Sequence, residues 1–452
     1  MTPRLLSIVR AGALAAACLT TTLAQALTAP SFAEFDRRAK AGEHLNVVFF
    51  GASLTWGANA SDPLLTSYRA VVADRLREKY PEARFRFWDA AIGGTGSQLG
   101  VFRLDRDVLR RKPDLVFLDF SANDDIEDND REKHSSYESL VRRLVVEAHV
   151  PVVQVIFPFL WNIQAGKLEK MKRRDAHLAI AEAYGTAVGD AIALGKERVA
   201  AGKTTLEALW PLDGVHPGDA GYTLFADAAW EAYLAAVKDE RVCHAPAKML
   251  YDDTYMTHER RRLSTIQPLP AGWHVAQPNV LSAYFDMMMS RWLEDEVVAS
   301  TPPEKKKSIA GKKPAEAEKP ADATEPSEKP GRLATKFRGG MVLLFGESTP
   351  KSVKYRVYID GKLVEHRERP EGPLLDAFDA GQFGRRAGGN VHHVQVIATG
   401  LDRTVEHTIE IEPLFDGPDQ ELRLESLCTA GGPATPQETK TAAEPCECES
   451  DS

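Results

Sequence analysis

The sequence predicts an α/β domain, a three-layer parallel sheet with helices on both faces, followed by a β-sandwich domain. Between Leu45 and Lys238, short apolar runs alternate with longer segments of helical periodicity, which is the pattern of βαβ units. After Cys243, expected strands follow one another without long helices, so a second domain begins there. The chain has 452 residues, 43% hydrophobic and 27% charged, and is long enough for both domains.

The expected strands of the first domain are short and rich in β-branched and aromatic residues. They cover residues 47–50, 85–88, 115–120 and 152–157. The expected helices have apolar residues at helical spacing and cover residues 67–79, 98–111, 137–149, 168–184 and 218–237. Strands that alternate with helices in this way form a parallel sheet that is buried on both faces.

The second domain is expected to span residues 244–431. Its predicted strands cover residues 342–345, 354–359, 362–366, 391–398 and 407–412. Asp360-Gly361 is a strong hairpin signal because both positions tolerate positive φ. Residues 301–332 are rich in Pro, Lys and Glu and have few bulky apolar side chains, so we expect a disordered insertion there, and a disordered tail over residues 432–452.

The N-terminus is expected to be separate from the fold. Basic residues precede a small-residue apolar stretch, and Ala24-Gln25-Ala26 has the pattern of a signal peptidase site. We expect a signal peptide over residues 1–26, a first domain over residues 27–243, and a secreted or periplasmic protein. A lipid anchor through Cys18 is the alternative interpretation of this segment.

Charge and cysteine content limit the classes of partner. The 56 basic and 65 acidic residues give a formal charge of -9, which does not favour nucleic-acid binding. No apolar run of about 18 residues follows the N-terminal segment, so no transmembrane segment is expected. In an oxidising compartment, Cys243 and Cys428 are candidates for a disulfide that joins the ends of the two domains. The sequence does not indicate the oligomeric state.

Four motifs place polar residues at or near the C-terminal ends of strands, where open α/β sheets bind ligands. The first is Gly51-Ala52-Ser53-Leu54-Thr55, whose serine hydroxyl would face that crevice. The second is Ile92-Gly93-Gly94-Thr95-Gly96, in which a glycine lets a backbone N–H approach a substrate oxygen. Taken singly, the serine also fits a helix N-cap and the glycines also fit a flexible turn.

The third motif is Ser121-Ala122-Asn123-Asp124, in which the Asn amide is an uncharged N–H donor suited to a developing oxyanion. The fourth is Asp213-Gly214-Val215-His216-Pro217. An Asp three residues before a His can accept the Nδ1 proton and leave Nε2 free to take a serine proton. A turn-capping Asn and a chance Asp-x-x-His explain these two motifs equally well when each is considered alone.

The four motifs together, in this order, resemble the SGNH superfamily of GDSL-type esterases and acylhydrolases over residues 45–230. The resemblance implies a flavodoxin-like three-layer fold and a catalytic triad of Ser53, Asp213 and His216. It also implies an oxyanion hole formed by the Ser53 and Gly94 backbone N–H groups and the Asn123 side chain, with Gly93 as the alternative to Gly94. Such a site needs no cofactor and no metal.

The sequence departs from the family pattern at two positions. Ala52 replaces the Asp of the usual Gly-Asp-Ser-Leu block, which affects the rigidity of the loop rather than the triad. Ser121 replaces the usual Gly two residues before Asn123, so we expect a slightly narrower approach to the site.

These residues predict a secreted serine esterase that works through an acyl-enzyme. Export and the sandwich module favour the removal of O-acetyl groups from a carbohydrate, so the expected partner is an acylated small molecule or acetylated polysaccharide. The alternatives are a lipid or short-chain acylhydrolase, and an inactive hydrolase domain that serves as a surface-binding module.

Aromatic, acidic and histidine residues outside the four motifs have other interpretations. Trp56 and Trp161 near strand ends are expected to line the pocket or to belong to the core. The acidic run over residues 124–132 is interpreted as a solvated loop. His392 and His393 are adjacent in an expected strand and therefore point to opposite faces, which argues against a shared metal ion.

Overall fold

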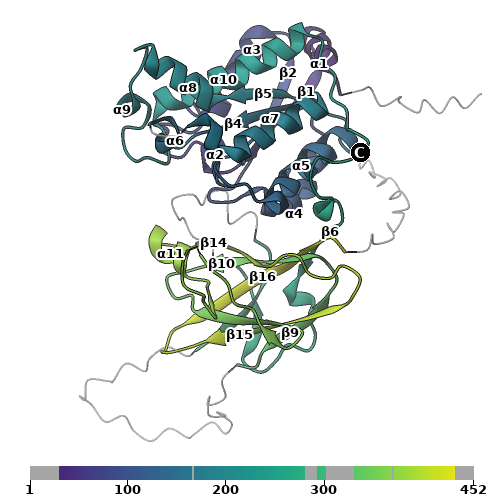
Figure 1. Ribbon diagram of the computed structural model, residues 1–452, viewed down its shortest axis with the longest axis vertical. Helices are drawn as coiled ribbons and strands as arrows, with labels where there is room; N and C mark the ends of the chain where they lie inside the picture. Colours follow the sequence, from purple (N-terminus) through teal and green to yellow (C-terminus); the bar gives the residue numbers. More distant parts are fainter. Residues whose placement is uncertain (1–29, 165–166, 280–292, 302–329, 369–370, 433–452) are drawn as a thin grey trace, which may run out of the picture.

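A computed structural model describes residues 30–164, 167–279, 293–301, 330–368 and 371–432. The expected signal peptide, nearly all of the expected insertion at 301–332 and nearly all of the expected tail lie outside the described residues. Within the described part, the helical α/β region and the strand-rich region form two adjoining bodies (Figure 1).

The first body is built on a parallel sheet with the strand order β2-β1-β3-β4-β5. Its strands are β1 (His44–Gly51), β2 (Arg84–Ala91), β3 (Leu115–Leu118), β4 (Val152–Ile156) and β5 (Ala187–Asp190). This is the doubly wound order in which the chain reverses direction at β1 and opens a crevice at the carboxyl ends of β1 and β3. The parallel sheet and its helices confirm the predicted fold class.

Strand β5 was not predicted because it is short and contains Gly189. A Cβ at Gly189 would lie 2.7 Å from the backbone oxygen of Ala228 in the closing helix. The glycine therefore allows this helix to pack directly on the strand, which is a tertiary requirement that local strand propensity opposes.

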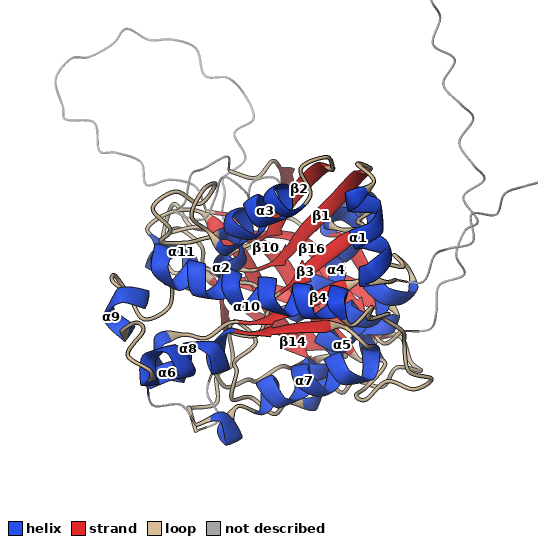
Figure 2. Ribbon diagram, turned by 90° about the horizontal axis from the view of Figure 1, so that it is seen from above, coloured by secondary structure: helices blue, strands red, loops and turns tan. Residues whose placement is uncertain are grey.

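Helices cover both faces of the parallel sheet. Figure 2 shows one set lying over the strands: α1 (Phe32–Lys40), α3 (Tyr68–Lys79) and α10 (Asp219–Lys238). The other set is α4 (Ser97–Asp107), α5 (Arg131–Val146) and α7 (Lys172–Tyr184). The remaining helices are α2 (Ser53–Trp56), α6 (Leu160–Gln164), α8 (Ala191–Ala200) and α9 (Leu206–Leu209), with 3-10 turns at Leu109–Arg111 and Leu168–Lys170. None of the helices in the described part of the chain is long and apolar enough to cross a membrane.

The second body consists of two antiparallel sheets. One has the order β14-β10-β16-β8-β7, with β6 also paired to β16; the other has the order β12-β11-β15-β9, with β13 paired to β11. The first sheet contains β6 (His258–Arg262), β7 (Trp273–Ala276), β8 (Glu296–Ser300), β10 (Met341–Ser348), β14 (Val391–Ala398) and β16 (Glu421–Ala430). The second contains β9 (Leu333–Phe337), β11 (Lys354–Ile359), β12 (Lys362–Leu363), β13 (Phe378–Asp379) and β15 (His407–Leu414). Helix α11 (Gln382–Ala387) precedes β14, and 3-10 turns lie at Thr254–Met256 and Leu263–Thr265.

Strand β10 is buried on both faces of its sheet. Met341, Leu343 and Phe345 belong to the same apolar cluster as the hydrolase-side residues, whereas Val342 and Leu344 pack inside the sandwich. Alternation along the strand explains how one uninterrupted apolar run serves two cores. Helices α4 and α5 lie between this sheet and the parallel sheet (Figure 1), so the two bodies share a continuous hydrophobic contact.

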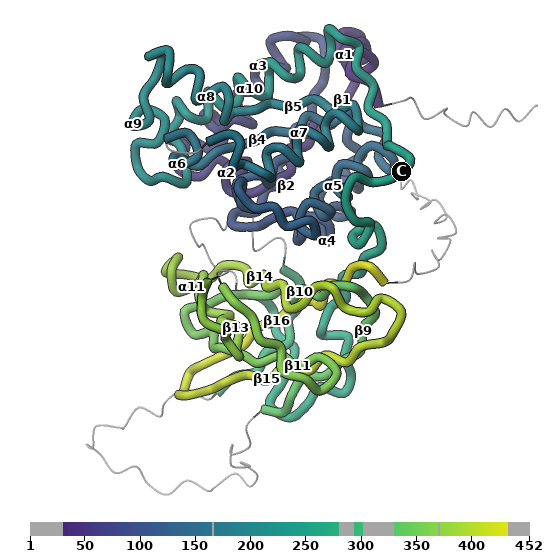
Figure 3. The backbone as a smooth tube through the Cα atoms, viewed as in Figure 1, coloured from purple at the N-terminus to yellow at the C-terminus, as the bar shows by residue number. Residues whose placement is uncertain are grey.

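The connection between the bodies runs along the first one before it enters the sandwich, as Figure 3 shows. The Cys243 N–H donates to Pro30, and the Leu250 N–H donates to the Glu138 carboxylate at 2.7 Å. The expected disulfide is wrong, because Cys243 and Cys428 are both free thiols. Both thiols are buried and have different partners. The Cys243 thiol donates to the Gly185 carbonyl, and the Cys428 sulfur contacts the Ser426 hydroxyl.

Candidate active site

The first three motifs meet because β1 pairs with both β2 and β3 in parallel register. Parallel neighbours end at the same edge of a sheet, so the loops that follow these strands lie side by side. Gly51 at the end of β1 lies close under the loop after β3, since a Cβ there would be 2.6 Å from the Asp119 carbonyl oxygen. The crevice at this edge therefore carries Ser53, the Gly94 loop and the Asn123 loop.

Ser53 and His216 form the centre of the site. Ser53 is the first residue of the short helix α2 and is 4% exposed. His216 lies in the loop before α10, and its Nε2 is 3.1 Å from Ser53 Oγ. The structure therefore brings together two residues that are 163 positions apart in the chain, at hydrogen-bond distance.

Asp213 lies on the other side of the imidazole. Its Oδ2 is 3.6 Å from His216 Nδ1, an ion-pair distance longer than a hydrogen bond. Its Oδ1 accepts the backbone N–H groups of Val215 and His216, each at 2.7 Å. This tight turn fixes the carboxylate relative to the imidazole, and it explains why the two residues are separated by three positions.

Asn59 is a site residue that the sequence analysis did not identify. Its Nδ2 donates to Asp213 Oδ2 at 2.7 Å, and the Asn59 backbone has a φ of 67°. Asn is the residue that most readily accepts this left-handed conformation after Gly, because its short amide can bond locally. An Asn six positions after the motif serine was the only sequence signal, and nothing local links it to Asp213.

The electrostatic environment favours a neutral imidazole and an ionised carboxylate. Burial lowers the pKa of His216 below its usual 6.5, and the Asp213 carboxylate opposes part of that change. Burial alone would raise the pKa of Asp213, but hydrogen bonds from the His216 and Val215 backbone and from Asn59 lower it below 3.8. At neutral pH, His216 can therefore accept a proton while Asp213 remains charged.

The Gly94 loop and the Asn123 loop are tied together by Asp124. Asp124 Oδ1 accepts the Ser97 N–H at 2.9 Å, and a Cβ on Gly96 would lie only 2.3 Å from that oxygen. Gly96 is therefore required by the close approach of the carboxylate. Gly94 and Asn123 are both exposed at the surface of the site, and Gly94 has a φ of +71°.

The acidic run after Asn123 is largely solvated, as expected, because Asp125, Glu127 and Asp130 are exposed. Asp124 is the exception: it is buried and holds the start of α4. Ser121 does not narrow the approach to the site, because its hydroxyl is buried, accepts the Phe157 N–H at 2.9 Å and donates to Asp119 at 3.2 Å. Ser121 thus connects the ends of β3 and β4 beneath the site.

Arg103 is a second residue that the sequence analysis missed. It is buried in α4 and donates to the carbonyl oxygens of Gly51 at 2.8 Å and Ala90 at 2.6 Å, at the ends of β1 and β2. Asp107, one turn later, pairs with it at 3.1 Å. A buried charge of this kind holds the two strand ends together under the Gly94 loop, and an Arg-x-x-x-Asp spacing in an apolar helix is the signal that could have indicated it.

The two tryptophans differ in their placement. Trp161 is 47% exposed and contacts the Phe159 ring at a tilt, with centroids 4.8 Å apart. It lies against the histidine loop, where a Cβ on Gly214 would be 3.3 Å from its ring. Trp56 is half-buried at the end of α2 and its carbonyl accepts Arg69. Trp161 therefore offers an exposed aromatic face beside the site.

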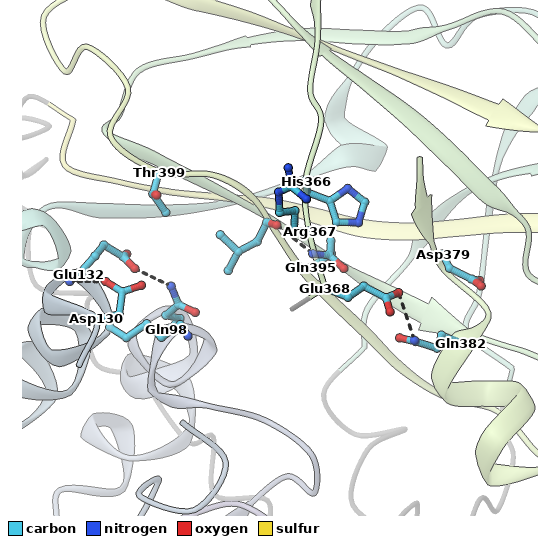
Figure 4. Close-up of a pocket in the computed structure, with 12 residues that line it drawn as sticks. Gln98, Asp130, Glu132, His366, Arg367, Glu368, Asp379, Gln382, Gln395 and Thr399 are labelled. Carbon is cyan, nitrogen blue, oxygen red and sulfur yellow. Dashed lines mark hydrogen bonds between the residues drawn. The ribbon is translucent and has the colours of Figure 1, made fainter. Parts of the chain in front are cut away.

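A polar cleft of about 620 Å³ lies between the two bodies, next to the first turn of α4 (Figure 4). Gln98 and Glu132 line one wall and hydrogen bond to each other at 2.9 Å. Arg367 and Glu368 of the sandwich line the other wall. The cleft therefore presents amide, carboxylate and guanidinium groups. In the described part of the chain, no cluster of three or more His, Cys, Asp or Glu side chains is arranged to hold a metal ion.

The doubly wound sheet and the serine, histidine and aspartate at its edge define an SGNH-type hydrolase, a carboxylic ester hydrolase. Residues 49–224 match the GDSL-like lipase/acylhydrolase family. An acetylxylan esterase of Geobacillus stearothermophilus is 28% identical over 211 residues, which cover 42% of this chain and 94% of that protein.

A solved structure shares both bodies of the fold. It is a two-domain esterase active on acetylated mannans, co-crystallised with mannopentaose, with a TM-score of 0.65 and 23% sequence identity. The match covers 89% of this chain and 95% of that chain, so the pairing of a hydrolase body with a sandwich is a known two-domain architecture.

Proposed function

We propose that this enzyme is a serine esterase that removes O-acetyl groups from a carbohydrate. The observation that carries the proposal is the 3.1 Å approach of His216 Nε2 to Ser53 Oγ, with the Asp213 carboxylate behind the imidazole. A serine hydroxyl is a weak nucleophile until a neutral base takes its proton. This pairing supplies that base.

In the proposed mechanism, Ser53 Oγ attacks the acetyl carbonyl carbon as its proton passes to His216 Nε2. The carbonyl oxygen becomes an oxyanion that accepts the N–H groups of Ser53 and Gly94 and the Asn123 amide. The C–O bond to the sugar then breaks, and the imidazolium donates its proton to the departing sugar oxygen. Water, activated by the same imidazole, hydrolyses the acetyl-enzyme to acetate and free Ser53.

Asp213 acts through His216 in this scheme. Its charge stabilises the imidazolium that forms, and its position beside Nδ1 selects the tautomer that leaves Nε2 free. The Nδ1 to Oδ2 separation is 3.6 Å, and catalytic contacts of this kind tighten when substrate binds.

A carbohydrate substrate is supported by two features and one relative. The exposed face of Trp161 beside the histidine loop suits the apolar face of a sugar ring, and the polar cleft between the bodies suits hydroxyl groups. The relative that covers the hydrolase domain is named an acetylxylan esterase. We also propose that the enzyme works outside the cytoplasm, because residues 1–26 have the pattern of an export signal.

The test is an activity panel of p-nitrophenyl esters from acetate to palmitate, together with acetylated xylan and acetylated mannan. We expect acetate release from at least one polysaccharide and a steep loss of activity as the acyl chain lengthens. A preference for octanoyl or longer esters would replace the carbohydrate proposal with a lipid acylhydrolase.

The role of Ser53 is tested separately. Ser53→Ala is expected to lower kcat by about 10⁶-fold, and a fluorophosphonate should label the wild type at Ser53. Ser61→Ala is the matched control. The Ser61 hydroxyl bonds to Thr66 and to Asp219, and neither residue belongs to the proposed triad or oxyanion hole. Wild-type activity in Ser53→Ala would refute the proposed nucleophile, and a wild type without esterase activity would favour a binding module.

A further inference from the structure

His392 on β14 of the sandwich lies against Gly94 of the hydrolase body. Its imidazole hydrogen bonds to the Gly94 backbone, and His392 Cε1 is 3.8 Å from the position that a Cβ on Gly94 would occupy. His393, the next residue, points into the sandwich, where its Nε2 is 2.8 Å from the Tyr355 hydroxyl. The expectation that the two histidines face opposite sides is confirmed.

The contact at Gly94 is part of a packed junction rather than an isolated touch. Ile92 of the hydrolase loop and Val391 of β14 are both buried and pack in one cluster with Phe383 of α11. The Phe383 ring lies edge-on to His392, with centroids 5.3 Å apart, and would be 3.3 Å from a Cβ on Gly94. The sandwich therefore closes one side of the Gly94 loop.

The other side of the loop is held by the parallel sheet. The Ile92 N–H donates to the Gly51 carbonyl at 3.1 Å, and the Ile92 carbonyl accepts the Thr95 hydroxyl at 2.7 Å. Gly94 itself has a φ of +71° and is otherwise exposed. A glycine in this conformation has neighbouring peptide planes that rotate easily, so a bond from His392 to the Gly94 carbonyl restrains the plane that follows Gly94 and limits the rotation of the residue.

We propose that His392 is a positioning residue, which holds the Gly94 carbonyl so that the Gly94 N–H points at the oxyanion. The inference rests on the proposed function, in which Gly94 is one of the oxyanion donors. Donors that are fixed before the reaction stabilise the developing charge without a reorganisation cost. The sandwich thereby contributes to catalysis through one side chain, in addition to covering the hydrolase body.

The imidazole suits this role because it remains neutral. His392 is 3% exposed, and burial lowers its pKa to about 3, assisted by the neighbouring His393 and opposed by the bond to Gly94. The His392 ring therefore stays neutral, with one N–H that donates to the Gly94 carbonyl, at every pH at which His216 is active. The positioning should not introduce a second titration into the pH profile.

The test compares His392→Ala with His393→Ala, using p-nitrophenyl acetate and acetylated xylan. Loss of one oxyanion donor costs about 10²- to 10³-fold in kcat, and a loosened donor is expected to cost about 10- to 100-fold. KM should change little in His392→Ala, and the acid limb of the pH profile should stay in place because it belongs to His216. His392→Asn, which keeps a neutral N–H donor, is expected to recover part of the loss.

His393→Ala is the matched control because it removes a buried bond on the same strand without touching the hydrolase loop. It should lower Tm and leave kcat unchanged. Wild-type kcat in His392→Ala, or an equal loss of kcat in both variants, would overturn the positioning role. Should His392→Ala not fold, His392→Phe against His392→Asn makes the same comparison, and equal kcat values in that pair would overturn the proposal.

The proposed function and this inference can fail separately. Activity that survives Ser53→Ala would remove the serine mechanism and, with it, the oxyanion that His392 serves. An inactive Ser53→Ala together with a fully active His392→Ala would leave the mechanism intact and remove only the positioning role.

Discussion

Asn59 provides a quantitative test of how the site is held together. Its amide donates to Asp213 Oδ2 at 2.7 Å, while Asp213 Oδ1 is held by backbone N–H groups. Asn59→Gly removes the amide and tolerates the φ of 67°. Asn59→Ala would add backbone strain of about 1–2 kcal/mol to the same loss, so glycine is the cleaner substitution.

The expected size of the effect follows from the exposure of the carboxylate. A hydrogen bond to a charged group contributes about 1.5–3 kcal/mol when buried. The Asp213 side chain is 47% exposed, so water can replace part of the bond. We therefore expect a loss of about 1 kcal/mol in transition-state stabilisation, which is about fivefold in kcat.

The assay is kcat on p-nitrophenyl acetate at neutral pH, with Tm measured in parallel. Asn59→Gly should reduce kcat about fivefold, by the same reasoning, with a small change in Tm. Asn59→Asp should reduce it further, because it places a like charge beside Asp213. Wild-type kcat in both variants would refute the view that Asn59 orients the Asp213 carboxylate.

Three further predictions concern His216, Gly94 and Glu296. Because burial keeps the pKa of His216 below 6.5, kcat/KM should hold at neutral pH and fall only as the pH drops through that lowered pKa; a flat profile down to about pH 4 would exclude His216 as the base. Gly94→Ala should lower kcat and cost about 1–2 kcal/mol of stability through its positive φ. Adding Phe383→Ala to that variant should relieve only the contact between the new Cβ and the Phe383 ring, not the backbone strain. Undiminished kcat in Gly94→Ala would contradict the oxyanion assignment. Burial and the neighbouring Glu347 raise the pKa of Glu296 to about 9. The folded state therefore holds a proton that the unfolded chain releases above about pH 4.5, and stability should fall as the pH rises toward 9. Glu296→Gln should flatten this dependence of Tm on pH, and an unchanged slope would contradict the prediction.

Element type followed from the local sequence pattern where β-branched and aromatic residues recur along a short segment. The strand Lys354–Ile359 and the strand Val391–Ala398 have the predicted bounds, although polar residues interrupt both apolar runs. The strand expected over residues 362–366 is only Lys362–Leu363, and Glu421–Ala430 was missed. The missed strand carries Arg423, Glu425 and Ser426 in buried positions, which look polar in sequence. Arg423 pairs with Glu296 of β8, and Glu425 pairs with Arg260 of β6, so partners from neighbouring strands make these buried charges possible.

The sequence by itself determined the chemistry that the site can offer: a serine after one strand, glycines and an asparagine after its neighbours, and an Asp-x-x-His before the last helix. Residue type and order carry that information because parallel strands present their following loops at one edge. Only the tertiary structure decided which distant groups hold those residues in place. Asn59 and Arg103 bond to distant segments of the hydrolase body, and His392 bonds across the two bodies. No local pattern encodes a hydrogen bond between segments that meet only in the folded chain.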